Sequence, residues 1–358
     1  PCQLQYACMT HIRTQDVIQA IERKLSAETS LSTPLPNSQL IVGSGNLPCI
    51  YNSLLDDILI KTVSLSSTSL VDTRYTPTIP KPADFTLETM NLGDESHRKF
   101  LRGKGIGYVL ALDKLTDDKL KKLHTASLLF ASSEYVKNQL KELGINTNIV
   151  ICPIPVQTEA RVLDPGKQNN TIMFGCILDS LRPTVQIANN VETIYNVFNK
   201  VFENNIDRRL NLLVASQHLD WARGYLKSIR DLRVRLIQYS GGQDLKKFIS
   251  SLDCYIECDP YPVTNFYLLQ ALGTGLHCIS MNHPVIALPD GLVYKVKSNN
   301  KALDPIAYNE NDLVEALQTY EALGEVIDTA TQDRIMYVRE RHNLQTIAHK
   351  IIESIRTI

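Results

Sequence analysis

The sequence predicts an α/β protein with two Rossmann-like domains that face each other across a crevice. Three observations lead to this prediction. Strand and helix patterns alternate with short links over residues 107–156, which is typical of a parallel α/β unit. A polar segment with a Pro-Gly turn follows at 157–170, and the pattern restarts at residue 171. We therefore expect an N-terminal domain over 1–156, a linker over 157–170 and a C-terminal domain over 171–358.

The composition is that of an ordinary globular protein, with 44% apolar and 21% charged residues among 358. The 37 basic and 38 acidic residues nearly cancel, so the charge does not support a dedicated nucleic-acid-binding protein. No apolar run is long enough for a transmembrane helix, and the N-terminus lacks the pattern of a secretory signal. The eight scattered cysteines indicate free buried thiols, and together these features predict a cytoplasmic protein.

The first hundred residues show a less regular pattern than the rest of the chain. Apolar runs at 4–9 and 38–45 predict strands, and the spacing at 14–25 predicts a helix between them. Residues 64–104 combine a Ser-rich stretch, a Pro-rich stretch and a polar one. We expect a long irregular insertion at about 64–104 in the N-terminal domain.

The elements of 107–156 have clearer boundaries. Ser133 stands before the second helix of this region and Gly144 directly after it, and both residue types are common helix caps. The pattern predicts buried strands at 107–113, 127–133 and 148–156 and helices at 116–126 and 134–143.

The C-terminal domain repeats the alternation over a longer stretch. Its longest predicted helix, 184–205, carries an apolar stripe at spacings of four and three residues: Ile187, Val191, Ile194, Phe198 and Val201. The helix predicted at 311–323 opens with Asp312 and Glu315 at the spacing of a capping box. The remaining predicted elements are strands at 171–178, 209–216, 234–240, 253–259 and 276–281 and helices at 244–252, 266–275 and 331–356.

Short motifs exclude several classes of site. The segment GSGNLP (43–48) follows a predicted strand and is either a phosphate-binding turn or a plain turn, because Pro48 replaces the third glycine of a dinucleotide fingerprint. Cys254 and Cys258 lie about 13 Å apart if both belong to one strand, which is too far for a shared zinc ion with His277. The motifs of serine hydrolases, P-loop NTPases and zincins do not occur.

Three features follow predicted strands at their carboxyl ends, where ligands bind in open parallel sheets. Asp113 either handles a substrate hydroxyl or caps the next helix. Arg182 is either a phosphate clamp or a solvated loop arginine. The segment 259–275 runs from a strand through a turn into a helix, whose first N–H groups favour an anion.

These residues resemble a known family. The segment LLFASSEYVKNQLKELGINTNIVICPIPV (128–156) is similar to the crossing between the domains of family 4 glycosyltransferases, which have the GT-B fold. TIMFGCILDSLRPT (171–184) resembles the strand and loop that the family writes f-v-G-r-l-…-K-G. Residues 234–280 resemble the family's donor-binding segment, which ends E-A-m-A-x-G-x-P-V-I. The similarity covers about 107–355.

The resemblance implies a donor-binding site on the C-terminal domain and a candidate catalytic residue on the N-terminal domain. It places Asp113 roughly where such enzymes carry an active-site histidine. It also implies that the final helix packs against the N-terminal domain. The positions that match the donor site are Arg182, Ser240, Gly241, Gly242, Thr264, Asn265, Phe266 and Gln270.

This chain also departs from the family's pattern. The first of two glutamates spaced E-x7-E becomes Pro262, which has no side-chain acceptor for the donor sugar. The second becomes Gln270, which still accepts a hydrogen bond from a ribose but carries no charge. The lysine and glycine expected near Arg182 are replaced by Pro183 and Thr184.

Two classes of function therefore stay open. The first is a glycosyltransferase that moves a sugar from a nucleotide-sugar donor to a glycan, protein or nucleic acid acceptor. The resemblance implies that it retains anomeric configuration and uses no metal and no cofactor, because side chains and a helix N-terminus stabilise the diphosphate. A different GT-B enzyme, such as a sugar-nucleotide epimerase, is a variant of this class. The second is a GT-B scaffold without catalysis that acts as a structural or interaction subunit with a protein partner.

Overall fold

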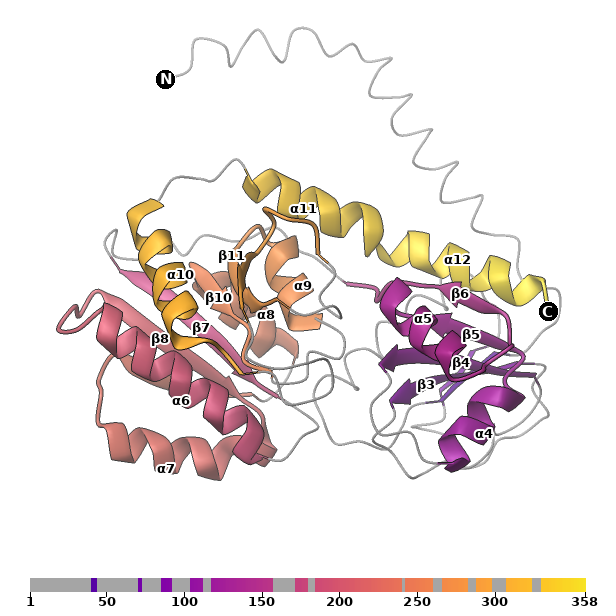
Figure 1. Ribbon diagram of the computed structural model, residues 1–358, viewed down its shortest axis with the longest axis horizontal. Coiled ribbons are helices and arrows are strands. Elements are labelled where there is room, and N and C mark those ends of the chain that lie inside the picture. Colours follow the sequence, from indigo (N-terminus) through magenta and orange to yellow (C-terminus); the bar gives the residue numbers. More distant parts are fainter. Residues whose placement is uncertain are drawn as a thin grey trace, which may run out of the picture.

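The computed structural model describes residues 40–43, 70–72, 85–91, 104–111, 117–156, 171–179, 184–239, 242–259, 266–282, 288–297, 307–323 and 330–358. These residues form two six-stranded sheets, and every strand pair in both sheets is parallel. Helices lie beside both sheets (Figure 1). The protein is therefore an α/β protein with two Rossmann-like sheets, as its sequence predicts.

The first sheet has the strand order β2-β1-β3-β4-β5-β6. Its strands are β1 (Leu40–Gly43), β2 (Leu70–Asp72), β3 (Phe85–Asn91), β4 (Lys104–Ala111), β5 (Leu128–Ala131) and β6 (Ile149–Ile151). The expectation of an irregular insertion at about 64–104 is wrong in this respect, because β2 and β3 lie there. Strand β3 pairs with both β1 and β4 and so belongs to the middle of the sheet.

Two helices cover one face of this sheet. They are α4 (Asp117–Thr125) and α5 (Glu134–Glu142), close to their predicted bounds. Ser133 caps α5 as expected, since its side chain accepts a hydrogen bond from the N–H of Val136. Gly144 follows with φ 74°, a left-handed conformation that glycine adopts without a steric cost. The elements expected at 4–9 and 14–25, the turn at 44–48 and the linker at 157–170 lie outside the described residues.

The second sheet has the strand order β12-β11-β10-β7-β8-β9. Its strands are β7 (Ile172–Leu178), β8 (Arg208–Val214), β9 (Val234–Gln238), β10 (Cys254–Ile256), β11 (His277–Met281) and β12 (Tyr294–Val296). In sequence order the chain runs outward from β7 to β9 and then returns to β10 on the other side of β7. The direction of winding thus changes between β7 and β10, which makes this pair the topological switch point of the sheet.

One face of the second sheet packs against α6 (Thr184–Val201), α7 (Leu219–Ile229) and α10 (Glu310–Leu323). The predicted stripe of α6 faces this core, with Ile187, Val191, Ile194 and Phe198 buried and Val201 partly buried. Helix α7 and strand β12 have no counterpart in the sequence prediction.

The other face packs against α8 (Gly242–Ser251) and α9 (Phe266–Gly273). Helix α8 approaches β7 closely at Gly175. A Cβ atom at this position would lie 2.5 Å from Cδ2 of Leu252 and 2.9 Å from Cζ of Phe248. Only glycine therefore lets α8 pack at this distance from the strand.

The start of α10 differs from the predicted capping box. The cap is Asn309, whose Oδ1 accepts hydrogen bonds from the N–H groups of Asn311 at 3.0 Å and Asp312 at 3.2 Å. Asp312 instead lies in the first turn, where its carboxylate accepts a hydrogen bond from the N–H of Lys297. The cap of α10 is therefore Asn309, about one turn before Asp312, the residue that the sequence pattern indicated as the cap.

The single helix predicted over 331–356 is two helices, α11 (Ala330–Arg341) and α12 (Leu344–Arg356). Asn343 starts α12 by accepting hydrogen bonds from the N–H groups of Gln345 and Thr346. At the break, the carbonyl of His342 accepts a hydrogen bond from the N–H of Val156, and its Nδ1 lies 2.8 Å from the carbonyl oxygen of Ile154. These two contacts tie the break between the helices to the segment that follows β6.

After this break, α12 packs against the first sheet (Figure 1). Its buried isoleucines share one hydrophobic core with residues of β4 and β5: Ile347, Ile351, Ile352 and Ile355 with Ile106, Tyr108, Leu128 and Phe130. Lys104 at the start of β4 also donates a hydrogen bond to the carbonyl of the last residue, Ile358. The expected return of the final helix to the N-terminal part of the chain is thus observed.

Candidate functional site

The strands β7 and β10 lie side by side, and polar side chains follow both of them directly. Asp179 comes after the last residue of β7, and Glu257 comes after the last residue of β10. Parallel strands end at the same edge of a sheet, so both carboxyl groups lie at the switch point. This edge is where open α/β sheets bind their ligands.

Asp179 links β7 to the start of α9. Its side chain is only 4% exposed, and its Oδ2 accepts a hydrogen bond of 2.5 Å from the hydroxyl of Tyr267. Tyr267 is the second residue of α9 and is itself buried. A short hydrogen bond of this kind fixes the first turn of α9 against the end of β7.

A third strand end contributes to the same cluster. The side-chain amide of Gln217, which lies after β8, is 3.4 Å from Oδ1 of Asp179 and 3.5 Å from Nε2 of His218. His218 is buried where α7 begins. The carboxylate of Asp179 therefore accepts hydrogen bonds from groups that follow β8 and β10, on both sides of its own strand.

Glu257 is completely surrounded by protein groups. Its Oε2 accepts a hydrogen bond of 3.1 Å from the hydroxyl of Tyr255, and its Oε1 accepts one of 3.0 Å from the N–H of Asp259. The hydroxyl of Tyr308 donates to its backbone carbonyl. These contacts hold the chain at the point where it leaves β10 for the loop that precedes α9.

Burial raises the pKa of Glu257 above its ordinary value near 4.5, because the ionised carboxylate loses its hydration. The folded protein then holds this proton more tightly than the unfolded chain does. The linkage relation gives a free energy of unfolding that falls as the pH rises from about 4.5 through the raised pKa.

We expect Glu257→Gln to remove this part of the pH dependence, because the amide keeps the shape without the titration. Urea unfolding at a series of pH values measures the effect, with Glu142→Gln on the exposed surface as the matched control. Identical pH profiles for wild type and Glu257→Gln would contradict the assignment.

The structure describes some of the sequence-predicted donor residues and not others. Phe266 opens α9, and its side chain lies in the core, so only its backbone N–H faces the end of the helix. Gln270 lies one turn later and is partly buried. Gly242 opens α8 after β9. The other predicted site residues lie outside the described residues: Asp113, Arg182, Ser240, Gly241, Thr264 and Asn265.

The sequence analysis overlooked the polar groups that follow the strand ends around the switch point. They are Asp179, Gln217, His218, Glu257 and Tyr267. The rule that selected Asp113, a polar residue directly after a buried strand, would also have selected Asp179 and Glu257. Tyr267 had no comparable signal, because an aromatic residue in an apolar helix is usually a core residue.

No cluster of three or more His, Cys, Asp or Glu side chains suited to a metal ion occurs within the described residues. The cysteines among them are free and buried: Cys152, Cys176, Cys254, Cys258 and Cys278. Burial raises the pKa of the Cys152 thiol to about 12, so this thiol stays protonated. No helix in the described part of the chain is long and apolar enough to span a membrane.

Comparison with known proteins relates the chain by structure and not by sequence. No protein-family model matches the sequence, and no curated protein does. The structure is similar to sucrose-phosphate synthase from Thermosynechococcus elongatus, with a TM-score of 0.63 at 10% identity over 90% of this chain and 99% of that one. It is also similar to HepE of Anabaena in complex with UDP-glucose, with a TM-score of 0.62 at 11% identity over 89% and 99%.

A further similar structure is the pneumococcal O-GlcNAc transferase GtfA in complex with UDP and GlcNAc, with a TM-score of 0.51 at 12% identity over 76% of this chain. The chain spans only about half the length of some similar proteins, with 56% of GtfA and 54% of TarM covered. The similar proteins are GT-B glycosyltransferases. At these identities the likeness concerns the fold, and the chain has the GT-B fold.

Proposed function

We propose that this protein is a glycosyltransferase that takes its sugar from a nucleotide-sugar donor. The observation that carries the proposal is that two buried carboxyl groups, Asp179 and Glu257, follow the adjacent strands β7 and β10 at the switch point of a GT-B sheet. In open parallel sheets the ligand binds outside the carboxyl ends of the strands at this point. Two similar structures, at 11–12% identity, are complexes with UDP or with UDP-glucose.

The donor's diphosphate is proposed to lie at the start of α9. The first N–H groups of a helix have no partner within the helix, and the helix dipole favours negative charge there. Arg182 would pair with the phosphates from the loop after β7. The turn at Ser240, Gly241 and Gly242 would contact the base, and Gln270 would accept a hydrogen bond from the ribose.

The chemistry proposed is transfer with retention of configuration, without a metal ion and without a cofactor. Arg182 and the N–H groups of residues 263–267 stabilise the leaving diphosphate electrostatically. Asp113 orients the donor sugar or the acceptor hydroxyl from the first sheet. A glycan, a protein or a nucleic acid is the proposed acceptor.

A scaffold without catalysis is the second candidate, and a departure from the family's pattern favours it. Pro262 stands where family 4 glycosyltransferases, which this chain resembles, carry the first glutamate of the E-x7-E pair. Proline has no side-chain acceptor for the donor sugar. Gln270, at the position of the second glutamate, accepts a hydrogen bond but carries no charge.

Nucleotide binding separates the two candidates. We expect one of the common nucleoside diphosphates, titrated calorimetrically, to bind the full chain. Arg182→Ala should weaken that binding by roughly 1.5–3 kcal/mol, the value of a hydrogen bond to a charged group. Arg223→Ala, at an exposed position on α7, is the matched control and should bind as wild type does.

An unchanged dissociation constant for Arg182→Ala would remove this residue from the site. Donor hydrolysis in the absence of acceptor provides the simplest test of catalysis. If no nucleoside diphosphate binds and no donor is hydrolysed, the scaffold is the better description.

A further inference from the structure

The opposite end of the second sheet exposes two aliphatic side chains. Leu232 precedes β9 and is fully exposed, at 101% of its reference area, and Ile206 precedes β8 and is 75% exposed. The register of β8 and β9 pairs Leu210 with Val234, so the loops that carry the two side chains enter the sheet side by side. We call the two loops, 202–207 and 230–233, the Leu232 end.

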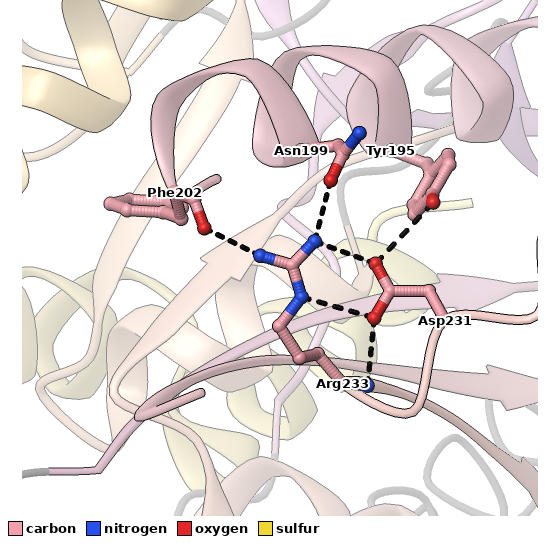
Figure 2. A network of polar contacts seen from close by, with 5 residues as sticks. All are labelled: Tyr195, Asn199, Phe202, Asp231 and Arg233. Atoms are coloured by element: carbon pink, nitrogen blue, oxygen red, sulfur yellow. Dashed lines mark hydrogen bonds and ion pairs between the residues drawn. The ribbon is translucent and has the colours of Figure 1, made fainter. Parts of the chain in front are cut away.

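The Leu232 end is held rigidly by a network of hydrogen bonds around Arg233 (Figure 2). The guanidinium donates to both carboxylate oxygens of Asp231, at 3.0 and 2.7 Å, to the carbonyl of Phe202 at 2.5 Å and to Oδ1 of Asn199 at 2.5 Å. Tyr195 adds a hydrogen bond of 3.3 Å to Asp231. Leu232 lies in the chain between Asp231 and Arg233, the two central residues of this network. The hydrogen bonds of these two neighbours fix the backbone that holds the Leu232 side chain in its exposed position.

The charge of this end differs from that of the chain as a whole. Within the described residues of 199–209 and 227–235, one exposed side chain is acidic, Glu203. The exposed basic side chains in the same ranges are Lys200, Arg209, Lys227, Arg230 and Arg235. Asp231 is already paired with Arg233 at 2.7 Å. The chain segments on either side of the loops of the Leu232 end are thus basic, in a protein whose net charge is −1.

We propose that the Leu232 end binds peripherally to a membrane surface rich in anionic phospholipid. Exposed aliphatic side chains with exposed basic residues nearby in the chain suit the boundary between acyl chains and anionic headgroups. Nucleic acid would use the basic groups alone, because phosphates offer no apolar surface for Leu232 and Ile206. The combination of both features therefore favours the lipid surface.

This inference does not depend on the proposed donor site. The polar cluster around Asp179 lies at the carboxyl ends of the strands, and the Leu232 end lies at their amino ends. Strand β8 has seven residues, which separates the two ends by roughly 20 Å. A protein bound to a membrane through the Leu232 end leaves the switch point facing away from the lipid.

Vesicle sedimentation with the full chain tests the apolar part of this surface. We expect binding to phosphatidylcholine vesicles that contain phosphatidylserine, and about tenfold weaker binding for Leu232→Ser. Ile206→Ser should weaken binding in the same direction. Val185→Ser, at a 71% exposed position at the start of α6, is the matched control and should bind as wild type does. All three sites are exposed, so these variants keep the fold.

The charged part is tested with a triple variant, Lys200→Gln, Lys227→Gln and Arg230→Gln. Each basic residue near an anionic surface strengthens binding by about fivefold, so the affinity of the triple variant for the vesicles should fall about 100-fold. The same number of exposed charges is removed in the control variant Lys121→Gln, Lys141→Gln and Lys247→Gln, whose binding should fall much less.

Three outcomes would overturn the proposal. They are an absence of vesicle binding by the wild-type protein, equal binding by Leu232→Ser and wild type, and retention on single-stranded DNA or RNA without binding to vesicles.

Discussion

Asp113→Asn is expected to lower the turnover of sugar transfer by about 100-fold, if the proposed function holds. The substitution keeps the size of the side chain and removes its charge. The sequence predicts Asp113 at the carboxyl end of a buried strand, a position from which its carboxylate would orient a hydroxyl or balance developing positive charge. The measurement is kcat with the donor that binds, at saturating concentrations of donor and acceptor.

Asp117→Asn is the matched control, because Asp117 is exposed in the first turn of α4. It should leave turnover unchanged. Thermal unfolding of Asp113→Asn should lie close to that of wild type, so that lost activity cannot be ascribed to lost folding. A wild-type rate in the folded Asp113→Asn variant would make Asp113 a helix cap and not a catalytic residue.

Phe198→Ala is expected to lower the free energy of unfolding by about 3–5 kcal/mol, the usual cost of truncating a buried aromatic side chain. The ring is fully buried in α6, with its centroid 5.9 Å from Phe174 and 5.3 Å from Phe202. The guanidinium of Arg233 lies 5.3 Å from the same ring. The truncation removes apolar area and leaves a cavity beneath the second sheet.

Urea unfolding followed by circular dichroism measures this loss. Phe198→Leu keeps most of the volume and should cost less than about 1.5 kcal/mol, which makes it the matched control. A loss below about 1 kcal/mol for Phe198→Ala would mean that the core closes around the missing ring, contrary to its close packing.

Local patterns in the sequence were sufficient to predict those features that depend on residues within a single helix or strand. The stripe of α6 and the cap of α5 at Ser133 are confirmed, because helix periodicity and capping depend on neighbours three or four residues away. The alternation of buried strands with amphipathic helices predicted the α/β class for the same reason. Strand β6 is shorter than predicted and ends at Ile151, shortly before Pro153 and Pro155.

Elements that depend on distant partners were harder to predict. Strand β3 lies in a stretch that was predicted to be irregular, but backbone hydrogen bonds to β1 and β4 hold it in the middle of the first sheet. The break between α11 and α12 contains neither proline nor glycine. It forms where His342 meets the carbonyl of Ile154, 188 residues earlier in the chain.

The sequence by itself determined the α/β class, the long helix α6 and the candidate strand ends, since each follows from residues close together in the chain. Only the tertiary structure decided which strand ends meet. Asp179 and Tyr267 are 88 residues apart, and they share a hydrogen bond because the sheet places β10 beside β7 and not beside β9, the strand that precedes it. Strand order depends on how the helices cover both faces of the sheet, and that is a property of the whole core.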